Sequence, residues 1–138
     1  MRPPRRAIDP EPRPKTGPLQ YGSDCMIRSI VKLAVDERKR EEVLSLLRAL
    51  VGPTQSIPGC LDCCLYKEVQ DGGLCFTSEW RSETDLKWFV RSEFFRSLLI
   101  AMDLATEEPT VRFDTISRTQ GMEYIGRVRR PRGGGQGD

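Results

Sequence analysis

The sequence has 138 residues, of which 38% are hydrophobic and 30% are charged, a composition typical of one globular domain. It contains no histidine, so the side chain most used for acid–base catalysis near neutral pH is missing. Residues 1–22 and 126–138 are basic, whereas the segment between them holds 13 basic and 17 acidic side chains. Basic arms on an acidic core do not form a specific nucleic-acid-binding face, although weak, salt-sensitive contacts with polyanions stay open.

Both ends of the chain are predicted to be unstructured. Six of the first 22 residues are proline, and the C-terminal run RVRRPRGGGQGD has almost nothing to bury. We therefore predict a disordered arm over 1–23, one domain over 24–122 and a disordered tail over 123–138. No apolar run approaches the ~20 residues that span a bilayer, and the Arg-rich start lacks the apolar segment of a secretory signal. We expect no membrane partner and a cytoplasmic location.

The five cysteines are an odd number, and without a secretion signal they are expected to be free thiols in a reducing compartment. The cluster Cys60-x-x-Cys63-Cys64 has no second cysteine pair and no histidine to complete four metal ligands. In an extended strand Cys60 and Cys64 would point to one face and Cys63 to the other, a poor geometry for chelation. We interpret the cysteines as small core residues with no metal; redox sensing and metal binding are the alternatives.

Residues 26–35 alternate as a strand does. Ile27, Val31 and Leu33 lie on one face, where Ser29 is the exception, and the other face is mixed, with Arg28 and Lys32 among its residues. Asp36 is placed to cap a helix over 37–51, whose apolar residues repeat at i, i+3, i+4 and i+7. Gly52-Pro53 is predicted to end that helix.

The second half begins with a hairpin of strands 60–69 and 74–80, in which Gly72 and Gly73 are expected to supply positive φ angles. Ser82 and Asp85 resemble a capping box that starts a second helical region. That region is expected to break near Ser92, where a further segment can be capped, and to end at Pro109. Residues 110–118 read as the final strand.

The order β-α-β-β-α-β predicts a ferredoxin-like α+β fold, an antiparallel sheet with two helices on one face. The other face, carrying Met26, Ile30, Leu74, Phe76 or their alternates, is too apolar to leave in water. We therefore expect a homodimer that packs sheet against sheet, with a ligand cavity between each sheet and its helices.

Several short motifs, taken together, resemble the antibiotic biosynthesis monooxygenase domain over about residues 25–120. They are Pro58-Gly59-Cys60 at the start of a strand, Glu79-Trp80 at the end of the next, the acid-rich helix start after it, and Ser92-x-x-Phe95 at the last helix. The resemblance implies a dimeric α+β barrel. Members of this family include cofactor-independent oxygenases of phenolic or quinol-type polyketides and haem-degrading enzymes.

The chain departs from the family at positions that carry chemistry. Two positions that commonly hold histidine are occupied here by Phe89 and Phe94. Compared with the haem-degrading members, the position of the haem-ligating histidine holds Leu99, and that of a pocket asparagine falls near Val31. Without an axial ligand haem use is not expected, and we predict no cofactor.

Three aromatic residues are candidates for binding an aromatic ligand. Trp80, which lines up with a pocket tryptophan of the haem-degrading members, either stacks on a flat substrate or seals the end of the barrel. Phe89 either lines the ligand cavity or belongs to the core, and the same two alternatives hold for Phe94 and Phe95. Tyr66 donates its phenolic hydrogen to a ligand or is satisfied at the dimer interface.

The charged candidates are Arg28, Lys32 and Glu79. Arg28 and Lys32 would hold an anionic or phenolate ligand if their strand face lines the cavity, and are solvated charges if it reaches the rim. Glu79 is the candidate general base if burial raises its pKa, and otherwise a surface or ion-paired carboxylate.

Two functions are compatible with these residues. The first is a cofactor-independent monooxygenase acting on a phenolic or quinol-like small molecule, with Arg28 or Lys32 stabilising the anion, Glu79 taking the proton and Trp80 positioning the ring. The second is a non-catalytic small-molecule-binding or regulatory dimer that has lost the pocket histidines. Whether the protein is an enzyme is left open by the sequence.

Overall fold

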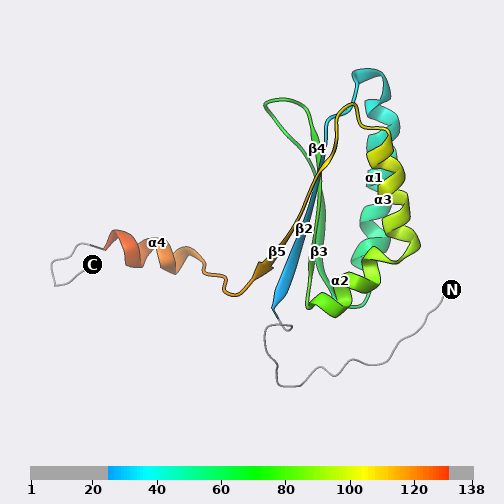
Figure 1. The fold of residues 1–138 in the computed structure, drawn as a ribbon. Coiled ribbons are helices and arrows are strands. Elements are labelled where there is room, and N and C mark those ends of the chain that lie inside the picture. Colours follow the sequence, from blue (N-terminus) through cyan, green and yellow to red (C-terminus); the bar gives the residue numbers. More distant parts are fainter. Residues whose placement is uncertain (1–24, 131–138) are drawn as a thin grey trace.

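The computed structural model describes residues 25–130, so the predicted arm 1–23 and residues 131–138 lie outside the described part of the chain (Figure 1). Four strands alternate with helices in the order predicted from the sequence, with one further helix at the end. The elements are β2 (Met26–Leu33), α1 (Glu37–Gln55), β3 (Cys60–Lys67), β4 (Leu74–Trp80), α2 (Glu83–Val90), α3 (Glu93–Asp103), β5 (Thr110–Ile116) and α4 (Met122–Arg129).

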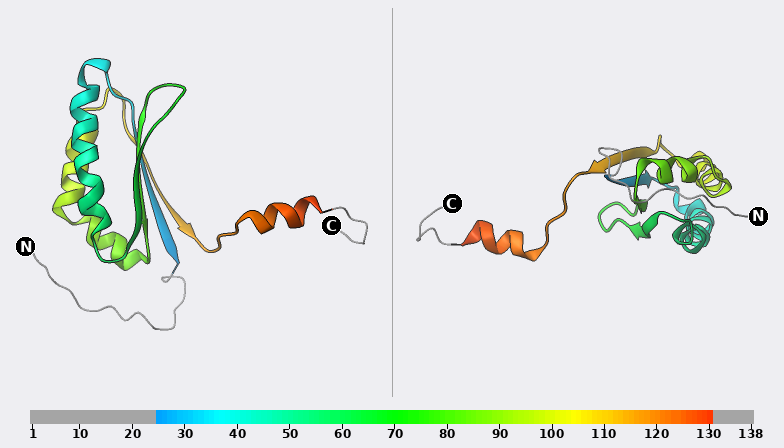
Figure 2. Two further views of the ribbon diagram at one scale, coloured as in Figure 1. Left: turned by 180° about the vertical axis from the view of Figure 1, so that it is seen from behind. Right: turned by 90° about the horizontal axis from the view of Figure 1, so that it is seen from below.

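The strands form one antiparallel sheet in the order β3-β4-β2-β5. Helices α1, α2 and α3 all lie on the same face of this sheet, and its other face is open (Figures 1 and 2). This is the ferredoxin-like α+β fold, so the predicted fold class is confirmed. The sheet ends at the free edges of β3 and β5 and does not close on itself. The dimeric barrel therefore stays a prediction.

Alternation along β2 and β4 builds the core. Ile27, Ser29, Val31 and Leu33 are buried on the helix-facing side of β2, as their spacing predicts. Residues of β4 that pair with them, from Leu74 to Trp80 in steps of two, are buried on the same side. The three covering helices begin at the predicted caps, since Asp36, Ser82 and Ser92 each accept a backbone N–H bond with a side-chain oxygen.

Two local predictions were wrong. Helix α1 continues through Pro53 to Gln55. The last turn buries Thr54 completely, and the Ser56 N–H bonds to the Gly52 and Pro53 carbonyls, which offsets the bond that proline cannot make. In the β3–β4 turn only Gly72 has a positive φ, of 73°, while Gly73 donates its N–H to the Asp71 carboxylate.

The C-terminal region also differs from the prediction, because helix α4 occupies residues that were expected to be unstructured. The arginines and glycines of this tail predict disorder, but the apolar residues at 122, 124, 125 and 128 share one side of a helix. Among residues 25–130, no helix is long and apolar enough to cross a membrane.

Candidate functional site

The helix-facing side of the sheet carries an aromatic cluster at the end of β4. The Trp80 ring, fully buried, stacks on Phe89 of α2 with centroids 4.7 Å apart and planes 22° from parallel. Phe89 in turn meets Phe95 of α3 edge-on, at 5.2 Å. Phe89 and Phe95 are both buried, so the cluster joins the sheet to two helices.

Beside this cluster, polar hydroxyls interrupt the apolar core. Ser29 of β2 and Ser78 of β4 are directly paired and both buried. The Ser78 hydroxyl accepts a hydrogen bond of 2.9 Å from Trp80 Nε1. On the other side of Ser29, the register places Phe113 of β5. Phe113, Ser29 and Ser78 thus form a row across three strands that ends next to Trp80.

The layer between sheet and helices is closed over β2 but open at β5. Val31 and Ser29 are buried, whereas their β5 partners Val111 and Phe113 are 41% and 46% exposed. Apolar side chains left in water at the rim of a core mark a binding surface. Behind this edge, Ser29, Ser78 and Trp80 are almost completely buried.

The open face of the sheet carries charge. Arg28 of β2 donates from Nε and Nη2 to Glu79 Oε2 of β4, at 3.0 and 2.9 Å. Their side chains are 45% and 27% exposed, so in one protomer the ion pair is partly in water. Lys32 pairs with Glu68 at 3.2 Å beyond the end of β3. The face expected to be strongly apolar is therefore mixed, because Leu74 and Phe76 point to the helices instead.

Tyr66 is half-exposed on β3. It lies two residues from Cys64 and pairs with Cys75 of β4, so it too stands on the open face. Hydrogen bonding with the Cys64 thiol is the main reason why the pKa of the Tyr66 phenol is raised.

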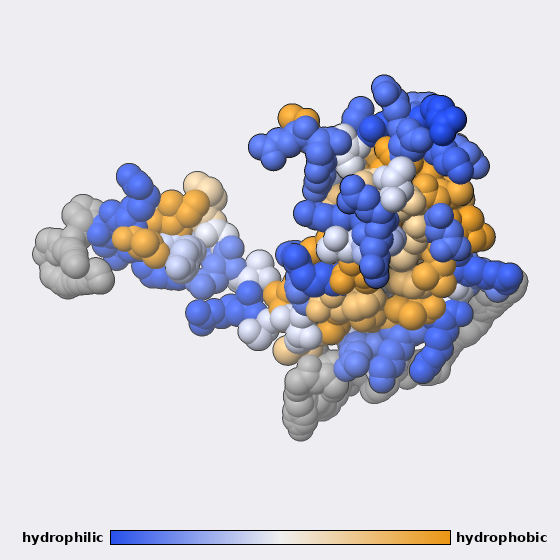
Figure 3. Space-filling model, turned by 45° about the horizontal axis from the view of Figure 1, so that its top comes forward, coloured by the Kyte–Doolittle hydropathy of each residue, from blue (hydrophilic) through white to orange (hydrophobic). Residues whose placement is uncertain are grey.

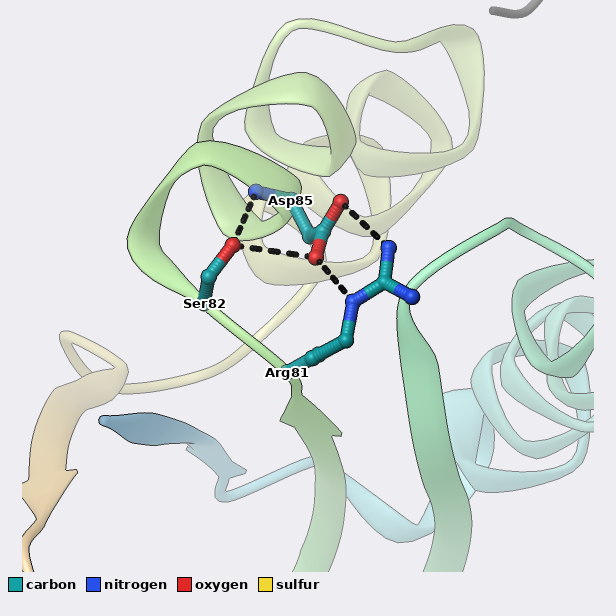
Figure 4. Close-up of polar contacts among 3 residues, drawn as sticks. All are labelled: Arg81, Ser82 and Asp85. Atoms are coloured by element: carbon teal, nitrogen blue, oxygen red, sulfur yellow. Dashed lines mark hydrogen bonds and ion pairs between the residues drawn. The ribbon is translucent and has the colours of Figure 1, made fainter. Parts of the chain in front are cut away.

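A buried carboxylate, Asp85, fixes the junction between β4 and α2 (Figure 4). Its Oδ2 accepts from Arg81 Nε at 3.1 Å and from the Ser82 hydroxyl at 3.0 Å, and Ser82 caps the backbone N–H of Asp85. A Cβ at Gly59, whose φ is 92°, would lie 2.3 Å from the Asp85 carboxyl carbon. Only glycine fits there, which explains the Pro58-Gly59 turn before β3.

The cysteine cluster is split by the sheet, but not as simple alternation predicts. A β-bulge between Cys60 and Asp62 places Cys60 on the helix side with Cys63, opposite Trp80 and Ser78, whereas Cys64 lies on the open face. Cys63 faces the core, and burial raises the pKa of its thiol to about 12. Burial likewise raises the pKa of Cys60 to about 11. All five cysteines are free, and among residues 25–130 no group of three His, Cys, Asp or Glu side chains is placed to hold a metal ion.

The structure thus brings the predicted site residues together in two separate groups. Trp80 and Phe89 stack on the helix side, whereas Arg28 and Glu79 pair on the open face, with Lys32 and Tyr66 on that face as well. One small molecule bound to a single protomer cannot touch both groups, because the sheet lies between them. Three residues of the helix side were missed by the sequence analysis: Ser29, Ser78 and Phe113. A signal existed for Ser29, the one polar residue on an apolar strand face.

Comparison with known families gives a match that covers this region. The family model described as antibiotic biosynthesis monooxygenase matches residues 26–98, which is more than half of the chain and runs from β2 into α3. The match therefore includes Ser29, Ser78 and the Trp80–Phe89 stack.

Individual proteins share sequence or fold with the chain. An uncharacterised protein of Synechocystis sp., sll1783, is 25% identical over 111 residues, which are 79% of this chain and 76% of that protein. A conserved protein from Methanosarcina mazei has a similar structure, with a TM-score of 0.62, 25% identity, and coverage of 68% of this chain and 95% of that one. Rv0793 from Mycobacterium tuberculosis, at 21% identity, shares the fold with a TM-score of 0.64 over 70% of this chain and 99% of its own.

Proposed function

The chain belongs to the antibiotic biosynthesis monooxygenase family, and from this premise we propose that it oxygenates a phenolic or quinol-like small molecule without a metal or flavin. The observation that carries the proposal is the aromatic helix-facing side, built by the elements that the family match covers. An indole ring with a hydroxyl at its edge suits a flat ring that carries oxygen substituents.

We place the substrate on the helix side, at the edge left open by β5. Its ring would slide past Phe113 toward Trp80, and the hydroxyls of Ser29 and Ser78 would donate hydrogen bonds to a phenolate or enolate oxygen. Trp80 and Phe89 are in contact in this structure, so binding beyond the entrance requires the Phe89 ring to turn aside. The core around these residues excludes water from the reacting carbon.

In the reaction that this family resemblance suggests, the substrate supplies the electrons. An enolate, formed by loss of one C–H proton from a ring CH2, gives one electron to O2, and the resulting radical and superoxide combine as a C–O bond. The peroxide then takes up a proton and loses water as the second C–H hydrogen leaves. One O2 is consumed, one oxygen stays as the new carbonyl and the other leaves in water. The first proton would leave to solvent at the open edge.

The charged open face has a different part in this proposal. A homodimer that packs sheet against sheet would place the Arg28–Glu79 pair in its interface, where each charge already has its partner. Glu79 could serve as the general base only for a substrate bound on this face. This alternative position of the substrate is tested with the same variants.

Oxygen uptake with a panel of hydroquinones and anthrones tests the proposal. We expect uptake of one O2 per molecule oxidised, reduced in Phe113→Asp and Ser78→Ala but retained in Glu79→Gln. The matched control is Arg38→Ala, because Arg38 is exposed at the start of α1, away from both faces. No uptake by the wild-type protein, or full uptake by Phe113→Asp, would contradict the proposal.

A non-catalytic binding protein of the same family is the second candidate. The observation that favours it is the chemistry of the helix side. Among the described residues, the buried polar side chains are Ser29, Thr54, Ser78 and Asp85, and the single carboxylate among them is held by Arg81 and Ser82. Hydroxyls bind an oxygen atom but do not take a proton at neutral pH. Thermal stabilisation by anthrones without oxygen consumption would identify a binder.

A further inference from the structure

Helix α4 has no contact surface on its own domain. Among its eight residues none is buried, and the cap position is a glycine, Gly121, which has no side chain to cap the helix. Met122, Ile125 and Val128 recur at every third position and are 77%, 49% and 60% exposed, with Tyr124 beside them. Glu123 and Arg127 lie on the opposite side of the helix. An amphipathic helix of this length is marginal alone in water, so α4 needs a surface on which to pack.

The domain offers one apolar surface of the right kind. It consists of the edge already described, Val111 and Phe113 of β5, together with Leu99 and Ile100 of α3, all half-exposed. Figure 3 shows hydrophobic surface spread over this part of the domain and, apart from it, on the α4 arm. We call these four residues the edge patch. Leu99 and Ile100 are neighbours in α3, and Val111 and Phe113 share one face of β5.

We propose that α4 of one protomer packs on the edge patch of a second copy of the same chain and thereby closes the substrate entrance of that copy. In every view α4 points away from the helices, on the side of the sheet where the face is open (Figures 1 and 2). That is the side on which the proposed sheet-to-sheet dimer places its second protomer. The inference rests on that proposed dimer.

Charge and two-fold symmetry also favour the α4 helix of a second copy as the segment that covers the edge patch. Arg127, Arg129 and Arg130 make the C-terminal end of α4 basic, whereas the last residue of α3, Asp103, and the loop residues Glu107 and Glu108 that lead to β5 are acidic and exposed. A basic arm end and an acidic loop attract one another across an interface. In a two-fold dimer each protomer gives one arm and receives one, so both patches are covered and no free end is left to add further copies.

The arm would make each site depend on its partner. Packing over Phe113 puts Tyr124 of the partner subunit at the entrance that leads to Ser29 and Trp80. Tyr124 carries the Arg127 guanidinium 5.7 Å from its ring centroid, so its ring presents a polar outer side. An aromatic ligand that enters along β5 would then be enclosed by both chains. Removal of the arm would leave the site open to water.

Cross-linking between isotope-labelled copies of the full chain tests the assignment. A benzophenone amino acid at position 125 is introduced, nitrogen-15 and unlabelled chains are refolded together in equal amounts, and the cross-linked peptides are weighed after irradiation. We expect cross-links to peptides containing residues 99–100 or 111–113, about half of them joining a heavy to a light chain. The same group at position 123, on the polar side of α4, is the matched control and should give few cross-links.

Other results would overturn the proposal. Cross-links confined to chains of equal mass mean that α4 packs on its own domain. If no cross-links form and the protein instead binds vesicles that contain anionic lipid, the helix is a membrane-surface element. A monomer mass in light scattering would contradict both the exchange of α4 between copies and the sheet-to-sheet dimer. Oxygen uptake is a separate readout: exchanged arms without uptake contradict the proposed oxygenation and leave the arm assignment standing.

A pair of substitutions in α4 gives a second measurement. Ile125→Asp with Val128→Asp removes the apolar side of the helix and should speed hydrogen exchange of the β5 amides, because the edge patch is then uncovered. Glu123→Gln, on the polar side, should leave that exchange unchanged. Equal exchange rates in both variants would contradict the assignment even if no cross-linkable protein were obtained.

Discussion

Trp80 and Phe89 stack with their ring centroids 4.7 Å apart, which ties the last residue of β4 to the last turn of α2. We predict that Phe89→Ala lowers the free energy of unfolding by about 3–5 kcal/mol, the range for deleting a buried phenylalanine. Trp88→Ala in the same helix should cost much less, since Trp88 is half-exposed. Urea unfolding of both variants checks this. Equal decreases in the free energy of unfolding would show that the Trp80–Phe89 stack does not hold α2 against the sheet.

Gly59 is required by both its backbone angle and its neighbour. Gly59→Ala would force a methyl group against the Asp85 carboxylate at a φ of 92°, and we expect a loss of at least ~1–3 kcal/mol from the strained backbone alone. Gly126→Ala is the control, because a Cβ there meets nothing within 4 Å. Thermal unfolding should show a lower midpoint for the first variant and an unchanged or higher one for the second. A tolerated Gly59→Ala would mean that the Asp85 junction can rearrange.

The fold could be predicted from the sequence because strand alternation, helix caps and the Asp71-Gly72 turn act over a few residues. The site could be predicted only in part. Glu79 and Trp80 were predicted to act on one substrate, but they are consecutive in β4, and the alternation of a strand places them on opposite faces. The position of Phe113 beside Ser29 was beyond reach, because it depends on the register between strands far apart in the chain.

The coupling energy between Arg28 and Glu79 tests the proposed dimer. An exposed ion pair contributes about 0.2–1 kcal/mol, whereas close charge pairs within interfaces show coupling energies of ~1.5 kcal/mol or more. We predict the larger value for dimer dissociation in a double-mutant cycle of Arg28→Ala and Glu79→Ala, measured by analytical ultracentrifugation. The exposed pair Arg38–Asp36 is the control. A coupling no larger than that of the control would place Arg28 and Glu79 outside the interface.

The buried thiols should react slowly with alkylating reagents. Because burial raises the pKa of Cys63 to about 12 from an ordinary value of 9.0, this side chain stays a neutral thiol at pH 8. Mass spectrometry after iodoacetamide treatment should show Cys63 modified in urea but protected in the native protein. Rapid native labelling of Cys63 would contradict its placement in the core.

The same pKa shift makes stability depend on alkaline pH. A thiol whose pKa is higher in the folded state binds its proton more tightly there, so its contribution is complete below pH 9 and is lost as the pH rises from 9 toward 12. Cys63→Ala should reduce the alkaline fall in the unfolding midpoint, at some cost in packing at all pH values. An unchanged alkaline profile would assign that fall to other groups.

The central claim is that the ligand binds on the helix side of the sheet, and fluorescence of Trp80 tests it most directly. The chain has two tryptophans, so Trp88→Phe leaves Trp80 as the single emitter. Titration with an anthrone under nitrogen should quench this emission to saturation. We predict that Phe113→Asp in this background weakens binding, because it replaces an apolar ring at the β5 entrance by a carboxylate that repels a phenolate. Glu79→Gln should leave binding unchanged. Binding that survives Phe113→Asp and is lost in Glu79→Gln would contradict the account and move the site to the open face.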